Sequence, residues 1–516
     1  MTEEPALKMQ QRSPLVLVLG SVICIGLLGV LLWSPWNAPG SEQASLVMYC
    51  SAGIMKPVQE IKTEYEKKYH VTIQIEPGPT GALLTKIRTA PNHGDLFLAA
   101  DKFFIEEARD DTPPRALESI PVATMRPVLA LSKEGEAKVK SLDDLLKPDV
   151  KVVFANPVAA VGKLTKKLLT ESGHWSTLEK QQTEFSAKVS LVGTVDEVSM
   201  KLQLGAADAG IVWNSSANQF GLKMIQIPSF DAAQEDITIA VLSSAKNPTA
   251  ALHFARYLTS REMGQAIFAK HHFEPLAEAD SWAERPQLDL MTGAMLRPGI
   301  EKTLKEFQLR EGVDVNWVYN GCGILVTQMK GGLRPDAYFS CDVSFMTQVQ
   351  DMFDSPLNIT ENDMVLLTPK GSGKVTGLES LLDEGMRVGV GHPTNSALGA
   401  LTQQLLEEAE MLEKLKQNGN IKVESATGDF LVNQVVTGAL DAVIVYRSNA
   451  MATKENLEKH LDMVEIKHEH ARATQPWAVG KNSKHKQVMN RLLEAIRSQS
   501  SRQQFEAIGF RWKVEP

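Results

Sequence analysis

The stretch LDDLLKPDVKVVFANP (Leu142–Pro157) has a gapless counterpart in LESLLDEGMRVGVGHP (Leu378–Pro393). Further pairs of motifs flank these two segments in the same order. They are DLFLAAD (95–101) with DAYFSCD (336–342), DAGIVW (208–213) with DAVIVY (441–446), and FAKHHF (268–273) with FEAIGF (505–510). Solenoid repeats are only about 20–50 residues long. The longer repeat found here therefore indicates a duplicated globular module.

The composition bounds the functions that the chain can have. It contains 516 residues, so each copy is long enough to bury a core of its own. The formal net charge is −8 and neither copy contains a basic run. This balance argues against nucleic-acid binding, which usually requires a basic patch. The four cysteines show no CxxC spacing, so the sequence predicts neither a zinc site nor a disulfide framework.

Near the N-terminus, Leu15–Trp33 is apolar, carries no charge, and is about as long as a bilayer-spanning helix. Lys8 and Arg12 precede it, and positive charge there keeps an N-terminus cytoplasmic. We therefore expect a cytoplasmic segment (1–14), then a transmembrane helix or signal anchor (15–33) in the inner membrane. The rest of the chain would lie in the periplasm or outside the cell. A cleaved signal peptide is the alternative, although no small-x-small cleavage site follows the apolar run.

Strand-like and helix-like patterns alternate within the first copy. The strand-like segments are residues 45–54, 71–77 and 94–101, with helical spacing between them. This β-α-β-α-β order predicts a mainly parallel sheet with right-handed crossovers. The strand at 126–135 leaves this lobe, a second βα series follows, and the strand at 236–244 returns. The pattern predicts two α/β lobes joined by a two-strand hinge, with the strand ends of both lobes facing one cleft.

The second copy repeats this order, and the polar stretch 277–287 separates the two. We predict module 1 at residues 45–280, with lobe A at 45–127 and 241–280 and lobe B at 128–240. We predict module 2 at residues 288–516, with lobe A at 288–362 and 475–516 and lobe B at 363–474. The predicted architecture is therefore two tandem α/β modules, each of two lobes, behind one N-terminal transmembrane helix.

Over about nine-tenths of the chain, both copies resemble the periplasmic molybdate/tungstate-binding proteins of ABC importers. The motifs that carry this resemblance are the small-residue end of the first strand, TGALLTKI (80–87), DLFLAAD, the NP and HP loops, DAGIVW with DAVIVY, and YLTSREMGQAIF (257–268). The resemblance implies the type II periplasmic-binding-protein fold in each module. It also implies a tetrahedral oxyanion ligand, an ABC permease as partner, and no cofactor. In that family hydroxyls and backbone N–H groups hold the anion, several of them at helix N-termini, where unpaired N–H groups favour negative charge.

Carried over position by position, the resemblance implies eight ligand-binding residues. They are Gly53, Thr80, Ala160 and Trp213 in module 1, and Met295, Cys322, Ser396 and Tyr446 in module 2. The family's first serine falls on Gly53 and Met295, neither of which has a hydroxyl. Its second serine falls on Thr80, which keeps a hydroxyl, and on Cys322, whose thiol is a weak donor. The resemblance therefore suggests that module 2 is the more degenerate copy.

Two aspartates, Asp196 and Asp429, lie near the family position that supplies a backbone N–H from an apolar residue. A carboxylate aimed at an anion in a dry site would repel it by several kcal/mol. Helix capping is one interpretation of these residues, because TVDE (194–197) fits a capping box. Coordination of the metal centre of an oxometallate is the other interpretation.

Cys322 and Cys341 follow two strands whose ends should face the same cleft. Three interpretations remain open for them: a disulfide, two unpaired buried thiols, or a pair that binds a soft ligand. The copy-one positions are Thr80 and Ala100, so any such chemistry would belong to module 2 alone.

The sequence thus predicts an extracytoplasmic substrate-binding protein of an ABC transport system that binds a small oxyanion between two lobes. The alternative is a membrane-anchored sensor or scaffold whose degenerate modules bind weakly or not at all. We do not expect an enzyme, because the sequence shows no nucleophile paired with a base, no GxSxG motif and no HExxH motif.

Overall fold

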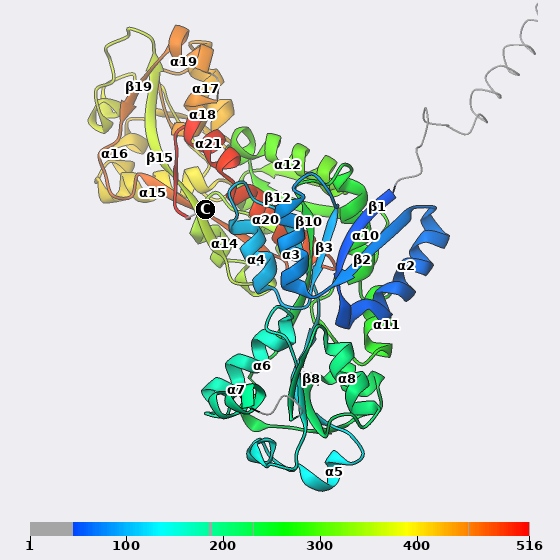
Figure 1. The fold of residues 1–516 in the computed structure, drawn as a ribbon. Coiled ribbons are helices and arrows are strands. Elements are labelled where there is room, and N and C mark those ends of the chain that lie inside the picture. Colours follow the sequence, from blue (N-terminus) through cyan, green and yellow to red (C-terminus); the bar gives the residue numbers. More distant parts are fainter. Residues whose placement is uncertain (1–44, 185–187, 231, 453, 515–516) are drawn as a thin grey trace, which may run out of the picture.

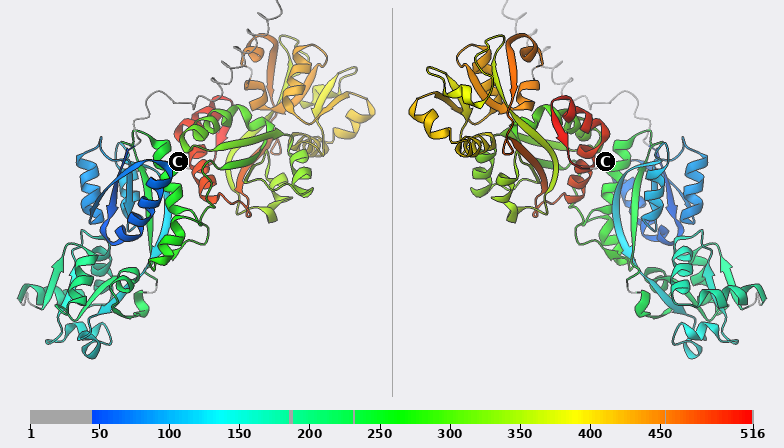
Figure 2. Two further views of the ribbon diagram at one scale, coloured as in Figure 1. Left: turned by 90° about the vertical axis from the view of Figure 1, so that its right-hand side faces the viewer. Right: turned by 90° about the vertical axis from the view of Figure 1, so that its left-hand side faces the viewer.

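The computed structural model describes residues 45–184, 188–230, 232–452 and 454–514. The predicted cytoplasmic segment (1–14) and transmembrane helix (15–33) lie outside the described residues. Among the residues that are described, no helix combines the length and the apolar character needed to cross a membrane. The described chain forms two modules placed end to end, and Figures 1 and 2 show them from three sides.

Lobe A of module 1 is a six-stranded sheet in the order β11-β4-β10-β3-β1-β2. Its strands are β1 (Ser45–Ser51), β2 (Thr72–Gly78), β3 (Leu96–Ala99), β4 (Ala116–Met125), β10 (Glu235–Leu242) and β11 (Glu274–Pro275). The helices α2 (Met55–Tyr69), α3 (Thr80–Thr89) and α4 (Phe103–Asp110) follow the first three strands in turn. β1 runs parallel to β2 and β3, as the β-α-β-α-β pattern predicts, whereas β10 runs antiparallel to β3 and β4.

Lobe B of module 1 is a five-stranded sheet in the order β7-β6-β8-β5-β9. Its strands are β5 (Pro127–Leu131), β6 (Val152–Ala155), β7 (Val189–Val192), β8 (Ala209–Trp213) and β9 (Lys223–Ile225). Its main helices are α6 (Ala160–Glu171), α7 (Trp175–Glu184), α8 (Val195–Gln203) and α9 (Asn214–Gln219). The chain enters this lobe where β4 gives way to β5 at Arg126 and returns to lobe A through β10.

Module 2 repeats this plan with one difference at the hinge. Its lobe A contains β12 (Gln287–Gly293), β13 (Asp314–Asn320), β14 (Ala337–Phe339), β20 (Arg472–Val479) and β21 (Phe510–Trp512). Its lobe B contains β16 (Val388–Gly391), β17 (Ile421–Ser425), β18 (Ala442–Tyr446) and β19 (Leu461–Glu465). One long strand, β15 (Leu357–Pro369), pairs with β20 in lobe A and with β18 and β19 in lobe B. The two sheets of module 2 are therefore joined as one ten-stranded sheet.

The helices of module 2 occupy equivalent places. They include α12 (Arg297–Glu311), α13 (Cys322–Lys330), α14 (Val343–Thr347), α15 (Ala397–Glu408), α16 (Leu412–Gln417), α17 (Gly428–Val436), α18 (Arg447–Met451), α19 (Lys454–His460), α20 (Lys486–Arg497) and α21 (Gln499–Ala507). Each module has its own cluster of buried apolar residues.

The modules contact each other through their A lobes, and the B lobes lie at the two far ends of the molecule (Figure 1). In module 1 the helix α10 (Pro248–Thr259), which precedes α11 (Gly264–Lys270), packs on α12 of module 2. Asp280, in the polar stretch between the modules, accepts hydrogen bonds from the backbone N–H groups of Gln487 (2.8 Å) and Val488 (3.1 Å). These N–H groups are in the first turn of α20, where a carboxylate is favourable. These hydrogen bonds fix the segment that connects the modules to the first turn of α20.

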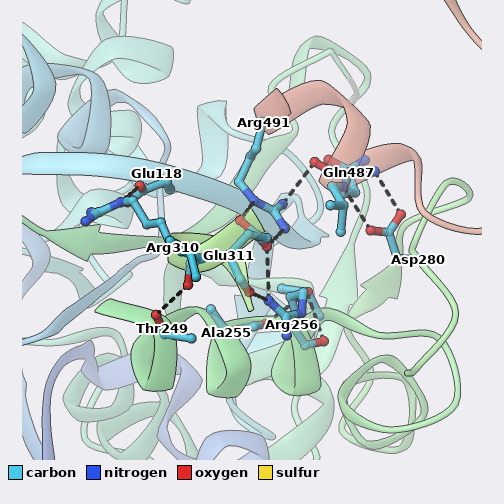
Figure 3. A network of polar contacts seen from close by, with 12 residues as sticks. Glu118, Thr249, Ala255, Arg256, Asp280, Arg310, Glu311, Gln487 and Arg491 are labelled. Atoms are coloured by element: carbon cyan, nitrogen blue, oxygen red, sulfur yellow. Dashed lines mark hydrogen bonds and ion pairs between the residues drawn. The ribbon is translucent and has the colours of Figure 1, made fainter. Parts of the chain in front are cut away.

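A buried ion cluster crosses this interface (Figure 3). Glu311, the last residue of α12, is 1% exposed, Arg256 of module 1 is 6% exposed, and Arg491 of module 2 is 4% exposed. Glu311 accepts hydrogen bonds from Arg256 Nη1 (3.2 Å) and from Arg491 Nε (3.1 Å). Burial acts to raise the pKa of Glu311, but the attraction and hydrogen bonds of the two arginines outweigh it, and this pKa lies below its usual value.

Beside this cluster, His253 of α10 is packed against aromatic rings. Its Nδ1 lies 2.7 Å from the hydroxyl of Tyr65, and the rings of Tyr69 and Trp282 meet it edge to face. Burial lowers the pKa of His253 to about 4, and the positive charges of Arg256 and Lys68 act in the same direction.

We expect His253 to make the protein less stable in acid. Because its folded pKa of about 4 lies below the reference value of 6.5, the unfolded chain binds more protons between these values. Above pH 6.5 His253 is neutral in both states and does not lower the free energy of unfolding. As the pH falls from 6.5 toward 4, the unfolded chain takes up the proton first and the free energy of unfolding decreases. The loss should be about 2–3 kcal/mol, measured by urea unfolding at several pH values. An equal dependence on pH in the His253→Gln variant would show that another group causes it.

Candidate interlobe sites

A small pocket lies between the lobes of module 1. Its cavity is about 20 Å³, room for about one water molecule. The four residues predicted for this module all line it, namely Gly53, Thr80, Ala160 and Trp213. The other lining residues are Ser51, Ala52, Gly78, Pro79, Ala100, Ala159, Val161, Thr194 and Val195. The structure therefore brings together residues that are far apart in the sequence.

Three helices of eight or more residues begin at this pocket. The helix α3 begins at Thr80 after Pro79, α6 begins at Ala160 after Ala159, and α8 begins at Val195 after Thr194. The first N–H groups of a helix have no partner within the helix, and the helix dipole is positive at this end. Two of these helices belong to lobe B and one to lobe A, so closing the lobes brings their N-termini together around one point.

Two buried hydroxyl groups from lobe A lie in the same pocket, beside the hydroxyl of Thr194 from lobe B. Ser51 Oγ and Thr80 Oγ1 are 2.7 Å apart, and the backbone N–H of Ala100 donates a hydrogen bond to Ser51 Oγ (3.2 Å). Both side chains are buried. Sequence reasoning placed the family's first serine at Gly53 and missed Ser51, two residues earlier. The signal was present, since Ser51 is the last residue of β1 and begins the small-residue run SAG.

The two lobes of module 1 touch at the rim of the pocket. The backbone N–H of Gly81 in lobe A donates a hydrogen bond to the carbonyl of Val158 in lobe B (3.1 Å). A Cβ added at Gly53 would lie 2.7 Å from Val195 Cγ1, so only a residue without a side chain fits there when the lobes are closed. A ligand larger than a water molecule must therefore enter by a separation of the lobes.

Asp196 is not among the residues that line the pocket, and Val195 takes that place. The Thr194 half of the predicted capping box is confirmed, because the hydroxyl of Thr194 accepts from the N–H of Glu197 (3.2 Å). The carboxylate of Glu197 accepts from the N–H of Gly193 (3.0 Å), one residue before the N–H that a capping box uses. Asp196 itself lies in the first turn of α8 and is not the capping residue. Burial raises its pKa, partly offset by Lys56 across the cleft. In the described part of the chain, no group of three or more His, Cys, Asp or Glu residues could hold a metal ion.

In module 2 the same helix starts converge, but different side chains fill the space between them. Met295, Cys322, Ser396 and Tyr446 are all buried, between 0% and 4% exposed. The helix α13 begins at Cys322, and α15 begins directly after Ser396. β18 ends at Tyr446. The predicted residues thus lie at the positions equivalent to those of module 1.

Gly293 ends β12 where Ser51 ends β1, and the two residues have the same backbone conformation. A Cβ added at Gly293 would lie 2.1 Å from Cys341 Sγ, so the sulfur fills the space of the serine side chain. Cys341 Sγ is 2.7 Å from Cys322 Sγ, which is longer than the S–S bond of about 2.05 Å. Both residues are free thiols. The structure thus shows two buried thiols with no disulfide between them, and binding of a soft ligand by the pair stays a prediction.

The second aspartate has a different role from the one predicted. Thr427 is the N-terminal flanking residue of α17, and Asp429 lies inside the first turn. Asp429 accepts a hydrogen bond from Asn449 Nδ2 (2.8 Å). The capping interpretation is therefore wrong for Asp429, because its side chain is directed at α18. Nearby, the buried hydroxyl of Tyr446 has no hydrogen-bond partner among the described residues.

The family model for bacterial extracellular solute-binding proteins matches residues 46–274 and again residues 288–511. The chain belongs to this family. A binding protein of Haemophilus influenzae is 26% identical over 237 residues, which are 45% of this chain and 92% of the relative. The molybdate-binding protein ModA of Mycobacterium tuberculosis is 25% identical over 253 residues, 45% of this chain and 90% of that protein. Each relative thus has the length of one module.

Solved structures of similar proteins also cover about half of this solute-binding protein. The periplasmic molybdate-binding protein of Azotobacter vinelandii is 18% identical, covers 44% of this chain and 98% of its own, and has a TM-score of 0.38. The sulfate-binding protein SubI of Mycobacterium tuberculosis is 17% identical, covers 45% of this chain and 88% of its own, and also has a TM-score of 0.38. These relatives are binding proteins by their names.

The chemistry of the module 1 pocket suits a solute-binding protein. None of the described residues that line it carries a charge. Its hydroxyls and the first N–H groups of three helices are neutral donors that can surround an anion. Such groups can hold and release a solute, whereas nucleophilic catalysis would need an activated nucleophile with a base beside it.

Proposed function

We propose that module 1 binds a small tetrahedral oxyanion of the molybdate or tungstate type between its lobes and delivers it to an ABC permease. In this proposal the chain is held in the inner membrane by residues 15–33, with its modules outside the cytoplasm. Two relatives named as molybdate-binding proteins, each matching one module, support the choice of ligand. The family description supports a place outside the cytoplasm.

One observation carries this proposal: Ser51 and Thr80 place two hydroxyls where three helix N-termini meet. A helix N-terminus presents free N–H donors and a positive dipole end, and both favour an anion. Neutral donors can hold a dianion without a lysine or arginine, which would also attract unrelated anions. Release then requires only that the lobes separate, because the donors of lobe B move away from those of lobe A.

Oxyanions should stabilise the full chain by mass action. At a molybdate concentration of about 100 times the dissociation constant, we expect a gain of about 2.7 kcal/mol. For a module of this size the melting temperature should rise by roughly 5–10 °C. The measurement is a thermal melt in molybdate, tungstate and sulfate, with chloride at equal ionic strength as the control.

The matched variant is Ser51→Ala with Thr80→Val, which removes both hydroxyls and keeps the size of the side chains close to the original. It should melt at the same temperature with and without molybdate. If millimolar molybdate, tungstate and sulfate all leave the melting temperature of the unaltered chain unchanged, module 1 does not bind these anions.

A second candidate function applies to module 2, where Gly293 and two thiols replace the hydroxyl pair. This module could serve as a sensor or scaffold that no longer binds an oxyanion tightly. In the same melting experiment, the transition of module 2 should then stay where it is while that of module 1 rises.

A further inference from the structure

The thiol pair of module 2 copies a hydrogen-bond arrangement of module 1 with sulfur in place of oxygen. In module 1 the N–H of Ala100 donates to Ser51 Oγ. In module 2 the N–H of Cys341 donates to Cys322 Sγ at 3.1 Å. In each module the donor follows the third strand of lobe A (β3 and β14), and the acceptor is buried. Two reactive groups thus meet where module 1 has only inert hydroxyls.

The surroundings of the two sulfur atoms are unequal. Burial alone would raise the pKa of Cys322, but hydrogen bonds from Cys341 and Tyr338 outweigh it, so the pKa lies below its ordinary value. The pKa of Cys341 is raised well above its usual value by its hydrogen bond with the Cys322 sulfur and by burial. A thiolate is the form of cysteine that attacks a disulfide. The N–H of Cys341, which points at Cys322 Sγ from 3.1 Å, would stabilise a thiolate on Cys322, and this geometry assigns the attacking role to Cys322 and the second, resolving role to Cys341.

We propose that Cys322 and Cys341 are a thiol–disulfide exchange site inside the interlobe surface of module 2, and that their reactant is a small-molecule or protein disulfide. This inference does not depend on anion binding by module 1.

The reaction balances in two steps. The Cys322 thiolate attacks one sulfur of the disulfide, forms a mixed disulfide, and releases the other sulfur as a thiolate. That thiolate takes the proton of Cys341. The Cys341 sulfur then attacks Cys322 Sγ and the intramolecular bond forms. The second sulfur leaves as a thiolate and takes up the proton that Cys322 released when it ionised. Two cysteine thiols are oxidised and one external disulfide is reduced to two thiols.

The hinge controls access to this pair. The sulfurs are buried, and the lobes meet over them at two glycines of lobe A. A Cβ at Gly321 would lie 2.4 Å from the carbonyl oxygen of Asn395, and one at Gly323 would lie 1.9 Å from that of Thr394. Exchange therefore requires an open module 2. The product has lost both S–H donors, so oxidation also changes what the reopened cleft can bind.

The test is to equilibrate the full chain in glutathione buffers that run from reducing to oxidising, to trap free thiols with a maleimide, and to map peptides without reduction. We expect Cys322 and Cys341 to lose their thiols together, the peptides that contain them to become linked, and dithiothreitol to reverse the change. Cys50 is the internal control, because burial raises its pKa and it should stay free.

Single variants distinguish the two roles. Cys341→Ser should accumulate a glutathione adduct on Cys322, whereas Cys322→Ser should form clearly less adduct on Cys341, because less of the Cys341 sulfur is present as the thiolate. Equal adduct yields would overturn the assigned roles. Two thiols that stay free in the unaltered chain under oxidising buffer would overturn the exchange site itself. The peptide map of the unaltered chain decides this even if a variant folds poorly.

Discussion

Replacing Glu311 with glutamine should lower the free energy of unfolding by about 3–5 kcal/mol, the usual cost of leaving a buried charge without its partner. Glutamine keeps the shape of the side chain but removes the negative charge. Arg256 and Arg491, which are 6% and 4% exposed, would then face each other across the interface without a counterion. Since Arg256 belongs to module 1 and Arg491 to module 2, the loss should also weaken the contact between the modules.

The measurement is unfolding of the full chain in urea together with calorimetry. The matched control is Glu118→Gln, which breaks the ion pair with Arg310 on the same interface. Glu118 and Arg310 are 20% and 38% exposed, so this change should cost no more than about 1 kcal/mol. Equal effects of the two variants would mean that the buried cluster is no more important than a surface ion pair.

Replacing Gly53 with alanine should weaken molybdate binding by about 10–100-fold. The added methyl would lie 2.7 Å from Val195 Cγ1 in the closed module. Overpacking of this kind costs about 1–3 kcal/mol, which corresponds to that change in affinity. The open module has no such contact, so the stability of the ligand-free protein should change little. Isothermal titration with molybdate measures the affinity.

The double variant Gly53→Ala with Val195→Ala provides the control, because it removes the methyl group that the new Cβ would strike. Its affinity should return to within about threefold of the original. A double variant that binds as weakly as Gly53→Ala alone would show that the glycine has a role other than allowing closure.

Much of the fold could be predicted because each strand or helix pattern in the first copy has a counterpart in the second. Strand-like segments that end in small residues, such as DLFLAAD, occur twice in the same order. This repeated order predicts two tandem α/β modules. Their strands β3 and β14 are three to four residues long, so one such segment alone would have been weak evidence. The single long strand β15 was harder to foresee, because the equivalent segment of module 1 is divided at Arg126 into two strands, β4 and β5.

The details of the sites depended on single positions. The four predicted residues of module 1 do meet in one pocket, because helix starts after parallel strands converge at one edge of a sheet. Ser51 was missed because β1 ends at Ser51 and the chain turns into a short 3-10 helix at Ala52–Ile54, so that both Ser51 and Gly53 line the pocket and only Ser51 has a hydroxyl. The contact between Cys322 and Cys341 depends on the missing side chain of Gly293. The Glu311 cluster joins residues 55 and 180 positions away, so nothing local in the sequence indicates it.

Anomalous diffraction would show directly whether an oxyanion binds between the lobes of module 1. Crystals of the chain grown with molybdate would be measured at the molybdenum absorption edge. We expect a strong anomalous peak within hydrogen-bond distance of Ser51 Oγ, Thr80 Oγ1 and the first N–H groups of α6 and α8. No peak there, or a peak only in module 2 or on the surface, would contradict it.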